Sequence, residues 1–262
     1  MSGSLPTQTN SLLYDSPVMN PNPNVLIFDT PEQVAQAAAD RFVDYSVASI
    51  AEHGSFAVAL AGGSTPRRAY ELLATDTFKG RVDWSLVHLF FGDERMVPPD
   101  SPESNYRMVN DALLARVALP PQNVHRIKGE TTPHECAESY EAELKSFFGT
   151  TGWPRFDLVL LGMGDDAHTA SLFPGSDALQ EKTKWVVATA HPQSQQARIT
   201  LTPPVINHAG RVTFLVTGEK KAAPLAHVLH GDATNKELPA QKIGPVQGIL
   251  EWLVDRSAAA EL

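Results

Sequence analysis

The sequence predicts an α/β fold, with a Rossmann-like, mostly parallel sheet flanked by helices. Short apolar runs that stop at Gly or Asp are usually followed by segments of helical periodicity, so strands and helices alternate along the chain. These runs are apolar throughout rather than alternating, which is typical of strands that are covered on both faces. Ligands bind at the carboxyl ends of strands in such sheets, so functional residues are expected in the turns that follow the strands.

The first half of the chain alternates regularly between strands and helices. Thr30 is a candidate N-cap with Pro31 at the first helical position, and Val34, Ala38 and Phe42 follow at spacings of four, on one helical face. The other elements continue the alternation: strands are predicted at 25–28, 56–61 and 86–91, and further helices at 66–73 and 105–114.

The second half continues the pattern. Thr132 and Pro133 begin a long helix that is predicted to end near Phe148. Strands are predicted at 156–161, 186–189, 199–201 and 212–216, and two helices, 220–229 and 245–260, are predicted to close the chain.

Length and composition favour a single globular domain. The chain has 262 residues, of which 42% are hydrophobic and 19% charged, and one α/β domain reaches this size without splitting. Residues 1–24 are rich in Ser, Thr, Asn and Pro and predict a flexible N-terminal arm. Residues 25–262 contain no repeat or Gly/Ser linker and predict one α/β domain.

Charge and cysteine content exclude several classes of protein. A net charge of −9 argues against a nucleic-acid surface, although local Arg and Lys residues can still bind a small phosphorylated substrate. A single cysteine, Cys136, allows no intramolecular disulfide or Cys-based zinc cluster and suits the cytoplasm. Cys136 as a nucleophile is an alternative, but its neighbours indicate a helix start. No apolar run is long enough to span a bilayer, and no secretory signal is evident, so no membrane association is expected.

Two of the strand-end turns offer groups for anions and sugars. Gly62, Gly63, Ser64 and Thr65 combine close backbone approach, hydroxyls and a helix start, which together make an anion cradle. An ordinary capped turn is the equal alternative. The turn after 86–91 carries Asp93, Glu94 and Arg95, with Asn105 after a loop. Either these charges are merely solvated, or Asp93 anchors sugar hydroxyls or the active-site network, Arg95 contacts an anion or oxyanion and Asn105 reaches the same cleft.

The turn after 156–161 is the most informative. Gly162 and Gly164 match part of a dinucleotide fingerprint, but two carboxylates beside a pyrophosphate are unfavourable chemistry. A carboxylate two residues before a histidine suits general-base catalysis, with Asp166 orienting His168. Asp165, Asp166 and His168 are an alternative metal set, but no second His or Cys lies at a recognisable spacing, so no metal is expected.

Two cations lie beside the remaining strand ends. Arg198 and Lys221 are each placed where a phosphate can be bound, and surface solvation is the alternative for either residue alone.

Taken together, these segments resemble the 6-phosphogluconolactonase family. The likeness runs in order through 62–66, 91–95 with 104–106, 156–174, 198–202, 217–222 and 248–255. It implies a fold of the glucosamine-6-phosphate deaminase/6-phosphogluconolactonase type. It also implies opening of a sugar-phosphate δ-lactone by water, without metal or organic cofactor, in the pentose phosphate pathway.

The resemblance also implies roles for single residues. His168 is the general base with Asp166 as its partner, and Arg95 is the active-site arginine. Arg198 and Lys221 bind phosphate. We further expect the Ser64 and Thr65 turn to help hold the phosphate, and backbone N–H groups near Gly62 and Gly63, or Arg95, to stabilise the oxyanion. The chain departs from the usual Gly-x-Gly-Pro-Asp-Gly-His turn by having Asp165 for Pro and Ala167 for Gly. Ala167 strains the turn if that position requires a positive φ.

Three further expectations follow. A deaminase or isomerase on the same scaffold is the nearest alternative enzyme, although the Ser-Leu-Phe-Pro ending at 171–174 favours the lactonase. A non-catalytic sugar-phosphate sensor domain is the alternative from another class, but the short polar arm has no room for a helix-turn-helix. The expected partner is the small-molecule lactone, with a monomer or small homo-oligomer as the assembly.

Overall fold

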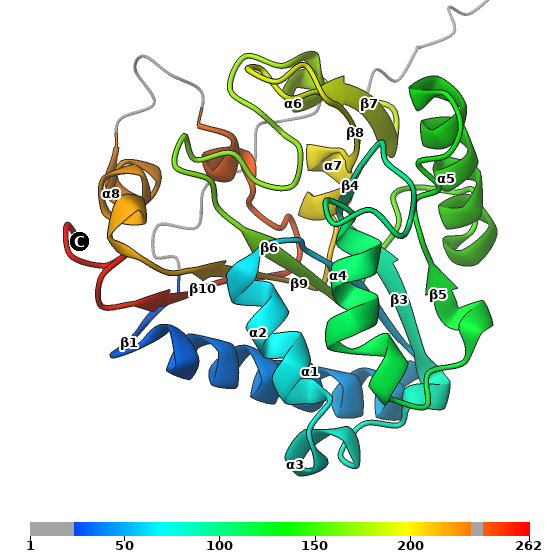
Figure 1. Cartoon of the computed structure of the whole chain (residues 1–262), viewed down its shortest axis with the longest axis horizontal. Helices are drawn as coiled ribbons and strands as arrows, with labels where there is room; N and C mark the ends of the chain where they lie inside the picture. The colour runs from blue at the N-terminus through cyan, green and yellow to red at the C-terminus, as the bar shows by residue number, and fades with distance from the viewer. Residues whose placement is uncertain (1–23, 232–237) are drawn as a thin grey trace, which may run out of the picture.

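A computed structural model of the chain describes residues 24–231 and 238–262 (Figure 1). The predicted arm, residues 1–24, therefore lies outside the described residues except for Asn24, which is the first residue of a strand. Among the described residues, no helix is both long and apolar enough to cross a membrane.

The centre of the molecule is a seven-stranded parallel sheet, which confirms the predicted fold class. Its strand order is β1-β10-β9-β6-β2-β3-β5. The strands are β1 (Asn24–Phe28), β2 (Phe56–Leu60), β3 (Val87–Phe91), β5 (Val124–His125), β6 (Leu158–Gly162), β9 (Arg211–Val216) and β10 (Ile249–Asp255). Most residues of β2, β3, β6, β9 and β10 are buried, as the continuous apolar runs predict, whereas the edge strands β1 and β5 are partly exposed.

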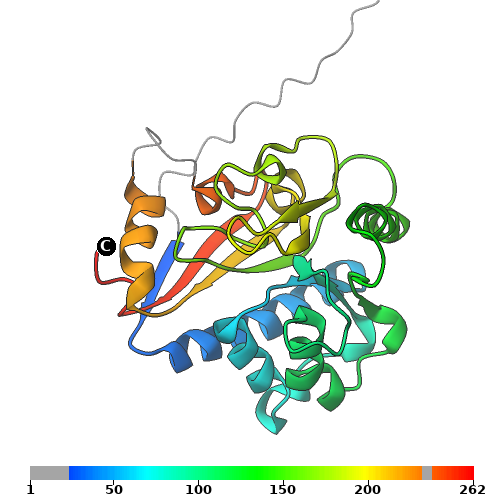
Figure 2. The same ribbon diagram turned by 45° about the horizontal axis from the view of Figure 1, so that its top comes forward.

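Helices cover both faces of this sheet (Figures 1 and 2). The α-helices are α1 (Pro31–His53), α2 (Ser64–Leu73), α3 (Asp76–Lys79), α4 (Asn105–Ala112), α5 (Pro133–Phe148), α6 (Asp177–Gln180), α7 (Pro203–Asn207) and α8 (Ala222–His230). Short 3-10 helices span Trp84–Leu86, Leu114–Arg116, Pro121–Asn123, Glu219–Lys221 and Pro239–Lys242. In Figure 2, α1 and α2 lie below the sheet, whereas α8 and the chain after β6 lie above it.

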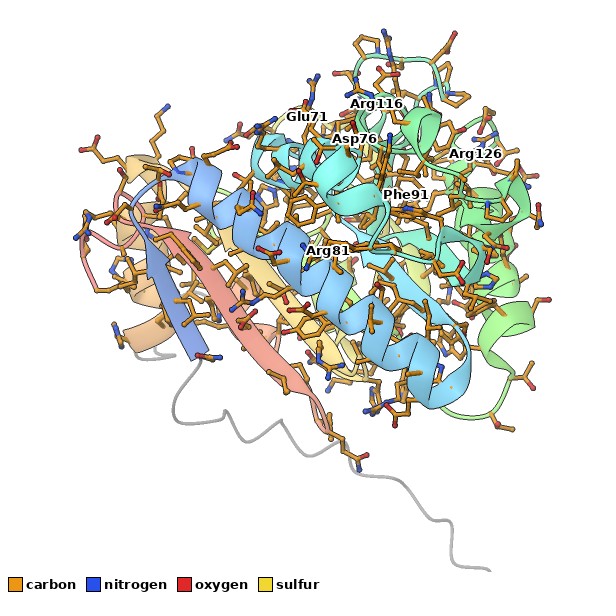
Figure 3. All side chains as sticks on the ribbon, turned by 90° about the horizontal axis from the view of Figure 1, so that it is seen from below. Glu71, Asp76, Arg81, Phe91, Arg116 and Arg126 are labelled. Atoms are coloured by element: carbon orange, nitrogen blue, oxygen red, sulfur yellow. The ribbon has the colours of Figure 1, made fainter. Side chains whose placement is uncertain are left out.

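The longest helix, α1, begins where the sequence predicts. Thr30 Oγ1 accepts a hydrogen bond from Gln33 N–H at 3.2 Å, and Pro31 occupies the first turn. The helix ends at Gly54, whose φ of 86° permits the left-handed C-cap. Arg81 lies beside this helix (Figure 3), with Nη1 3.1 Å from Oδ1 of Asp40.

The predicted C-terminal helix at 245–260 is wrong, because the middle of this segment, Ile249–Asp255, forms the strand β10. The strand lies between β1 and β9, and Trp252 stacks on Phe214 with ring centroids 3.9 Å apart and an angle of 4°. Its run of apolar residues obeys the same rule that predicts the other buried strands. Only its position inside the sheet distinguishes it from a buried helix.

A second, three-stranded antiparallel sheet has the order β4-β8-β7. Its strands are β4 (Asp93–Arg95), β7 (Val186–Ala190) and β8 (Ala197–Leu201). The sequence predicts β7 and β8 but assigns residues 93–95 to a turn. In the structure they form a short strand, and this pairing brings Arg95 opposite Arg198.

The order of the parallel strands predicts where on the sheet a ligand binds. From β2, the chain adds β3 and β5 on one side and then returns to add β6, β9 and β10 on the other. Ligands in open α/β sheets bind outside the carboxyl ends of the strands at such a reversal. The turns after β2 and β6 meet there.

Candidate active site

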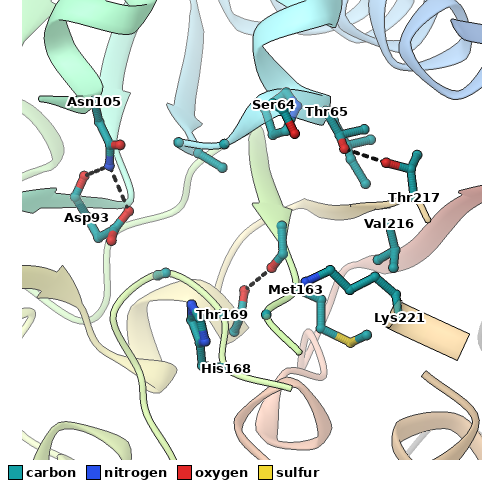
Figure 4. Close-up of a pocket in the computed structure, with 18 of the residues that line it drawn as sticks. Ser64, Thr65, Asp93, Asn105, Met163, His168, Thr169, Val216, Thr217 and Lys221 are labelled. Carbon is teal, nitrogen blue, oxygen red and sulfur yellow. Dashed lines mark hydrogen bonds between the residues drawn. The ribbon is translucent and has the colours of Figure 1, made fainter. Parts of the chain in front are cut away.

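A cavity of about 370 Å³ opens at this reversal point, a volume typical of small-molecule sites. It includes every site residue that the sequence predicts except Asp166, which lines a neighbouring cavity. Figure 4 shows Asp93 and Asn105 on one side of the cavity, and Lys221, Thr65 and Thr217 on the other. Residues from both sheets line it: Ala61, Gly62, Gly63, Ser64, Thr65, Pro66, Asp93, Arg95, Asn105, Gly162, Met163, Gly164, His168, Thr169, Ala170, Phe173, His191, Arg198, Leu215, Val216, Thr217 and Lys221.

The candidate base, His168, lies in the turn that follows β6. Its Nδ1 lies 2.6 Å from Oδ1 of Asp166, and the same oxygen accepts its backbone N–H at 3.1 Å. Asp166 therefore holds the ring through Nδ1, which leaves Nε2 as the other nitrogen for chemistry. The hydrogen bond from His168 lowers the pKa of Asp166 to about 2, so this carboxyl group is charged at neutral pH.

The backbone of this turn is tightly constrained. Gly164 N–H donates to His168 O at 2.8 Å, and Ala167 N–H donates to Gly164 O at 3.1 Å. A Cβ on Gly164 would lie 2.1 Å from Nδ1 of His168, so only glycine leaves room for the imidazole. Ala167 has a φ of 61°, in the left-handed region that is strained for alanine. Of the two possibilities that the sequence leaves open, positive and negative φ, the structure therefore has the strained one.

The turn after β2 is held by a buried tyrosine. The Tyr70 hydroxyl accepts Ala61 N–H at 3.1 Å and donates to Ala61 O at 2.9 Å. The helix α2 begins two residues earlier than predicted, at Ser64, with Gly63 as N-cap at a φ of 105°. Its amino end therefore lies at the cavity, where helix N–H groups favour an anion.

Asp93 and Asn105 contact each other at the cavity wall. Asn105 Nδ2 donates to Asp93 O at 2.9 Å and to Asp93 Oδ1 at 3.2 Å, while Ser171 Oγ donates to Asp93 Oδ2 at 2.6 Å. The Asn105 amide oxygen would lie 2.1 Å from a Cβ on Gly62, which explains this glycine. Both residues thus build the framework of the cavity. A contact of Asp93 with sugar hydroxyls stays a prediction.

The neighbouring Glu94 has a structural role that sequence reasoning missed. Its carboxylate accepts hydrogen bonds from Ser104 Oγ at 3.0 Å and from the N–H groups of Asn105 and Tyr106, each at 2.8 Å. It therefore caps the amino end of α4 and fixes Asn105. Burial raises its pKa. No local motif signals this, because the helix is ten residues away in the sequence.

Arg95 and Arg198 lie opposite one another on β4 and β8. Opposed residues of an antiparallel pair share a face of the sheet, and both side chains line the cavity. The two Nε atoms are buried and have no hydrogen-bond partner among the described residues. Burial, followed by the charge of Arg95, lowers the pKa of Arg198. This pair is suited to an anion.

Lys221 follows β9 and forms an ion pair with Asp165. Asp165 thus contacts Lys221, while Asp166 contacts His168, so the two carboxylates do not converge on one point. Over the described residues, no group of three or more His, Cys, Asp or Glu side chains is arranged to hold a metal ion.

The alternative nucleophile, Cys136, lies outside the cavity in α5. It is buried, and burial raises the pKa of its thiol to about 11. A thiol in this state is not an activated nucleophile. Cys136 is therefore an ordinary buried residue in the first turn of α5.

Besides Glu94, sequence reasoning missed three residues at or beside the site. Thr217 Oγ1 lies 2.7 Å from Thr65 Oγ1 and joins the turns after β9 and β2. Asp255, buried at the end of β10, accepts Gly218 N–H at 3.0 Å and supports the turn before Lys221. His191 lines the cavity from the loop between β7 and β8. Asp255 was missed because its strand was predicted as a helix.

Comparison with known proteins identifies the family. Residues 29–252 match the family described as glucosamine-6-phosphate isomerases/6-phosphogluconolactonase. The chain belongs to this family. The expectation of a 6-phosphogluconolactonase-type enzyme is thereby confirmed, together with the predicted fold.

Individual relatives agree with this assignment. The chain is 39% identical over 235 residues to a 6-phosphogluconolactonase of Haemophilus influenzae, covering 90% of this chain and 98% of that one. It is 41% identical over 237 residues to a 6-phosphogluconolactonase of a Nostoc species, covering 88% and 96%. The structure of 6-phosphogluconolactonase from Trypanosoma cruzi matches with a TM-score of 0.84 at 30% identity, covering 93% and 98%.

The deaminase alternative has weaker support. A monomeric glucosamine-6-phosphate deaminase matches with a TM-score of 0.74 and 22% identity, covering 91% of this chain and all of that chain. At this identity the likeness shows a shared fold alone.

Proposed function

We propose that this protein hydrolyses 6-phospho-D-glucono-1,5-lactone to 6-phosphogluconate, the lactone-opening step of the pentose phosphate pathway. The observation that carries the proposal is the His168–Asp166 pair in a cavity that also contains Arg95, Arg198 and Lys221. A base in this cavity can activate water for attack on an uncharged lactone carbonyl, and the cations can bind the phosphate of the same substrate.

His168 is the general base in this proposal. Nε2 takes a proton from a water molecule as the water oxygen forms a bond to the lactone carbonyl carbon. Asp166, whose Oδ1 is hydrogen-bonded to Nδ1 of His168 at 2.6 Å, stabilises the imidazolium that forms. Cleavage of the bond between that carbon and the ring oxygen then completes the reaction, and His168 returns the proton to the departing oxygen.

The phosphate is held by cations and by a helix end. Arg198 and Lys221 supply charge, and Ser64 and Thr65 lie in the first turn of α2, where the helix dipole favours an anion. When the substrate binds, Lys221 breaks its ion pair with Asp165 and pairs with the phosphate instead. The carbonyl oxygen gains negative charge during attack. Backbone N–H groups of the turn at Gly62 and Gly63, or Arg95, stabilise it there.

The direct test is hydrolysis of freshly generated 6-phosphogluconolactone by the purified protein, measured against spontaneous hydrolysis at the same pH. We expect a rate that rises linearly with protein concentration, and a rate equal to the spontaneous one would contradict the proposal. Ammonia release from glucosamine 6-phosphate in a parallel assay would instead indicate the deaminase.

Location and assembly stay predictions. The single cysteine favours a cytoplasmic protein, whereas two rice relatives are described as chloroplastic, at 35% and 38% identity over 248 residues. A monomer or small homo-oligomer is expected, and the lactone is the expected partner.

A further inference from the structure

We propose that His191 is a phosphate-binding residue that donates a hydrogen bond from Nε2 to the substrate. This inference rests on the proposed function. His191 follows β7 directly, and its side chain lines the same cavity as His168, Arg95 and Arg198.

The loop between β7 and β8 uses all the other polar atoms of His191. Its N–H donates to Gln196 O at 3.0 Å, and its carbonyl oxygen accepts Gln195 N–H at 2.9 Å. Its Nδ1 accepts the N–H groups of Gln193 and Ser194, each at 3.3 Å. A neutral imidazole that accepts at Nδ1 carries its hydrogen on Nε2. Nε2 is therefore the donor left for a ligand.

The strand register places His191 on the face of the sheet that carries the arginine pair. Thr189 lies opposite Arg198, which in turn lies opposite Arg95, so these three side chains share one face of the antiparallel sheet. His191 lies two residues beyond Thr189, just after β7, and its N–H to Gln196 O hydrogen bond continues the ladder, so the alternation of side chains puts it on the same face. Because His191 and both arginines also line the same cavity, a phosphate bound by Arg198 would lie in the cavity that His191 lines.

The ring of His191 is also held by packing. Phe173 contacts it edge to face, with centroids 5.1 Å apart at 72°, and the same Phe173 lies 5.0 Å from the ring of His168. Gln195, at a φ of 57°, is held in the left-handed region by the loop that closes around His191. These contacts set the imidazole in place before a ligand arrives, which is the arrangement that favours binding.

The test uses His191→Asn, because the short Asn side chain keeps an acceptor for the two loop N–H groups but removes the Nε2 donor. Loss of a hydrogen bond to a charged group predicts a KM for 6-phosphogluconolactone that rises about tenfold, with kcat changed less than about threefold. For unphosphorylated glucono-1,5-lactone, kcat/KM should not change. Gln193→Ala, on the same exposed loop, is the matched control and should leave both substrates unaffected.

An unchanged KM in His191→Asn would overturn the inference, and so would an equal loss with both lactones, which would indicate a role in loop structure. Calorimetric binding of 6-phosphogluconate and of inorganic phosphate to both proteins keeps the test independent of turnover. If the wild-type protein does not hydrolyse the lactone, the proposed function fails, but weaker phosphate binding by His191→Asn would still support the donor.

Discussion

Arg95 and Arg198 lie directly opposite one another across β4 and β8, with both Nε atoms buried and without a hydrogen-bond partner among the described residues. Like charges at opposed positions of a ladder destabilise it, and unpaired buried donors add to that cost. The free protein therefore keeps an unfavourable arrangement at the place where an anionic substrate is expected. Such a cost is typical of functional sites.

Replacing Arg198 tests this interpretation. In Arg198→Met, we expect the KM for the lactone to rise at least about tenfold, because a charge-assisted hydrogen bond of roughly 1.5–3 kcal/mol is lost. The free energy of unfolding of the unliganded protein should be unchanged or higher, since the repulsion from Arg95 disappears. Enzyme kinetics and denaturant unfolding without phosphate measure both, with the exposed Arg116→Met as control. A less stable protein with an unchanged KM would assign Arg198 to the framework instead.

If Lys221 binds the substrate phosphate as proposed, its ion pair with Asp165 competes with the substrate. In Asp165→Asn the lysine loses its counter-charge but keeps a neighbour of the same size, so phosphate no longer displaces an ion pair. The pair is exposed on the Asp165 side, where such pairs contribute about 0.2–1 kcal/mol. We expect the KM to fall by a factor of up to about five with kcat unchanged, and the effect to shrink at high salt. A higher KM would show that Asp165 positions Lys221.

Two positions in the turn that carries His168 should respond differently to a change of one methyl group. Gly164→Ala places a methyl group 2.1 Å from Nδ1 of His168 and 2.8 Å from Oδ1 of Asp166, so the pair must separate. We expect kcat to fall by about 10² or more, within the range of lost general-base catalysis.

Ala167→Gly is the matched change at the other position. Relief of the positive φ is worth about 1–2 kcal/mol, but loss of a buried methyl costs about 0.8 kcal/mol and the freer unfolded chain a further 0.4–1 kcal/mol. These terms nearly cancel, so stability should change by less than about 1 kcal/mol and kcat by less than about threefold. Loss of activity in this variant would mean that Ala167 itself shapes the site.

The pH dependence of stability should report the ionisation of Asp166. Its pKa is lowered from 3.8 to about 2 by the hydrogen bond from His168, so the folded state favours the charged carboxylate. This stabilisation is present above the ordinary pKa and is lost as the pH falls toward about 2. Because the carboxylate is half exposed, we expect less than about 1 kcal/mol. Asp166→Asn should lose less stability than the wild type between about pH 4 and pH 2 in denaturant titrations, and equal losses would contradict the assignment.

Sequence pattern predicts those parts of the fold and site that depend on near neighbours. The Thr30 cap, the helix start at Thr132 and the Asp166–His168 pair all involve residues two or three positions apart. The turns that meet at the cavity were predicted because parallel strands end at the same edge of a sheet.

Features that depend on tertiary partners were not predicted. Trp252 lies in a run that suits a helix or a strand equally, and only its stacking on Phe214 between two strands decides the outcome. Glu94 and Asp255 act through backbone groups about ten and forty residues away, and His191 is oriented by a hairpin loop. The positive φ of Ala167 is imposed by the turn around it, because alanine by itself disfavours a positive φ.

The proposed mechanism depends on His168 as the general base. Its most direct test is single-turnover and steady-state hydrolysis of fresh 6-phosphogluconolactone by His168→Ala, with spontaneous hydrolysis subtracted and 6-phosphogluconate binding measured by calorimetry. We expect kcat to fall by roughly 10²–10⁴ while 6-phosphogluconate still binds, because the phosphate contacts remain. Turnover by His168→Ala close to that of the wild type would contradict this mechanism.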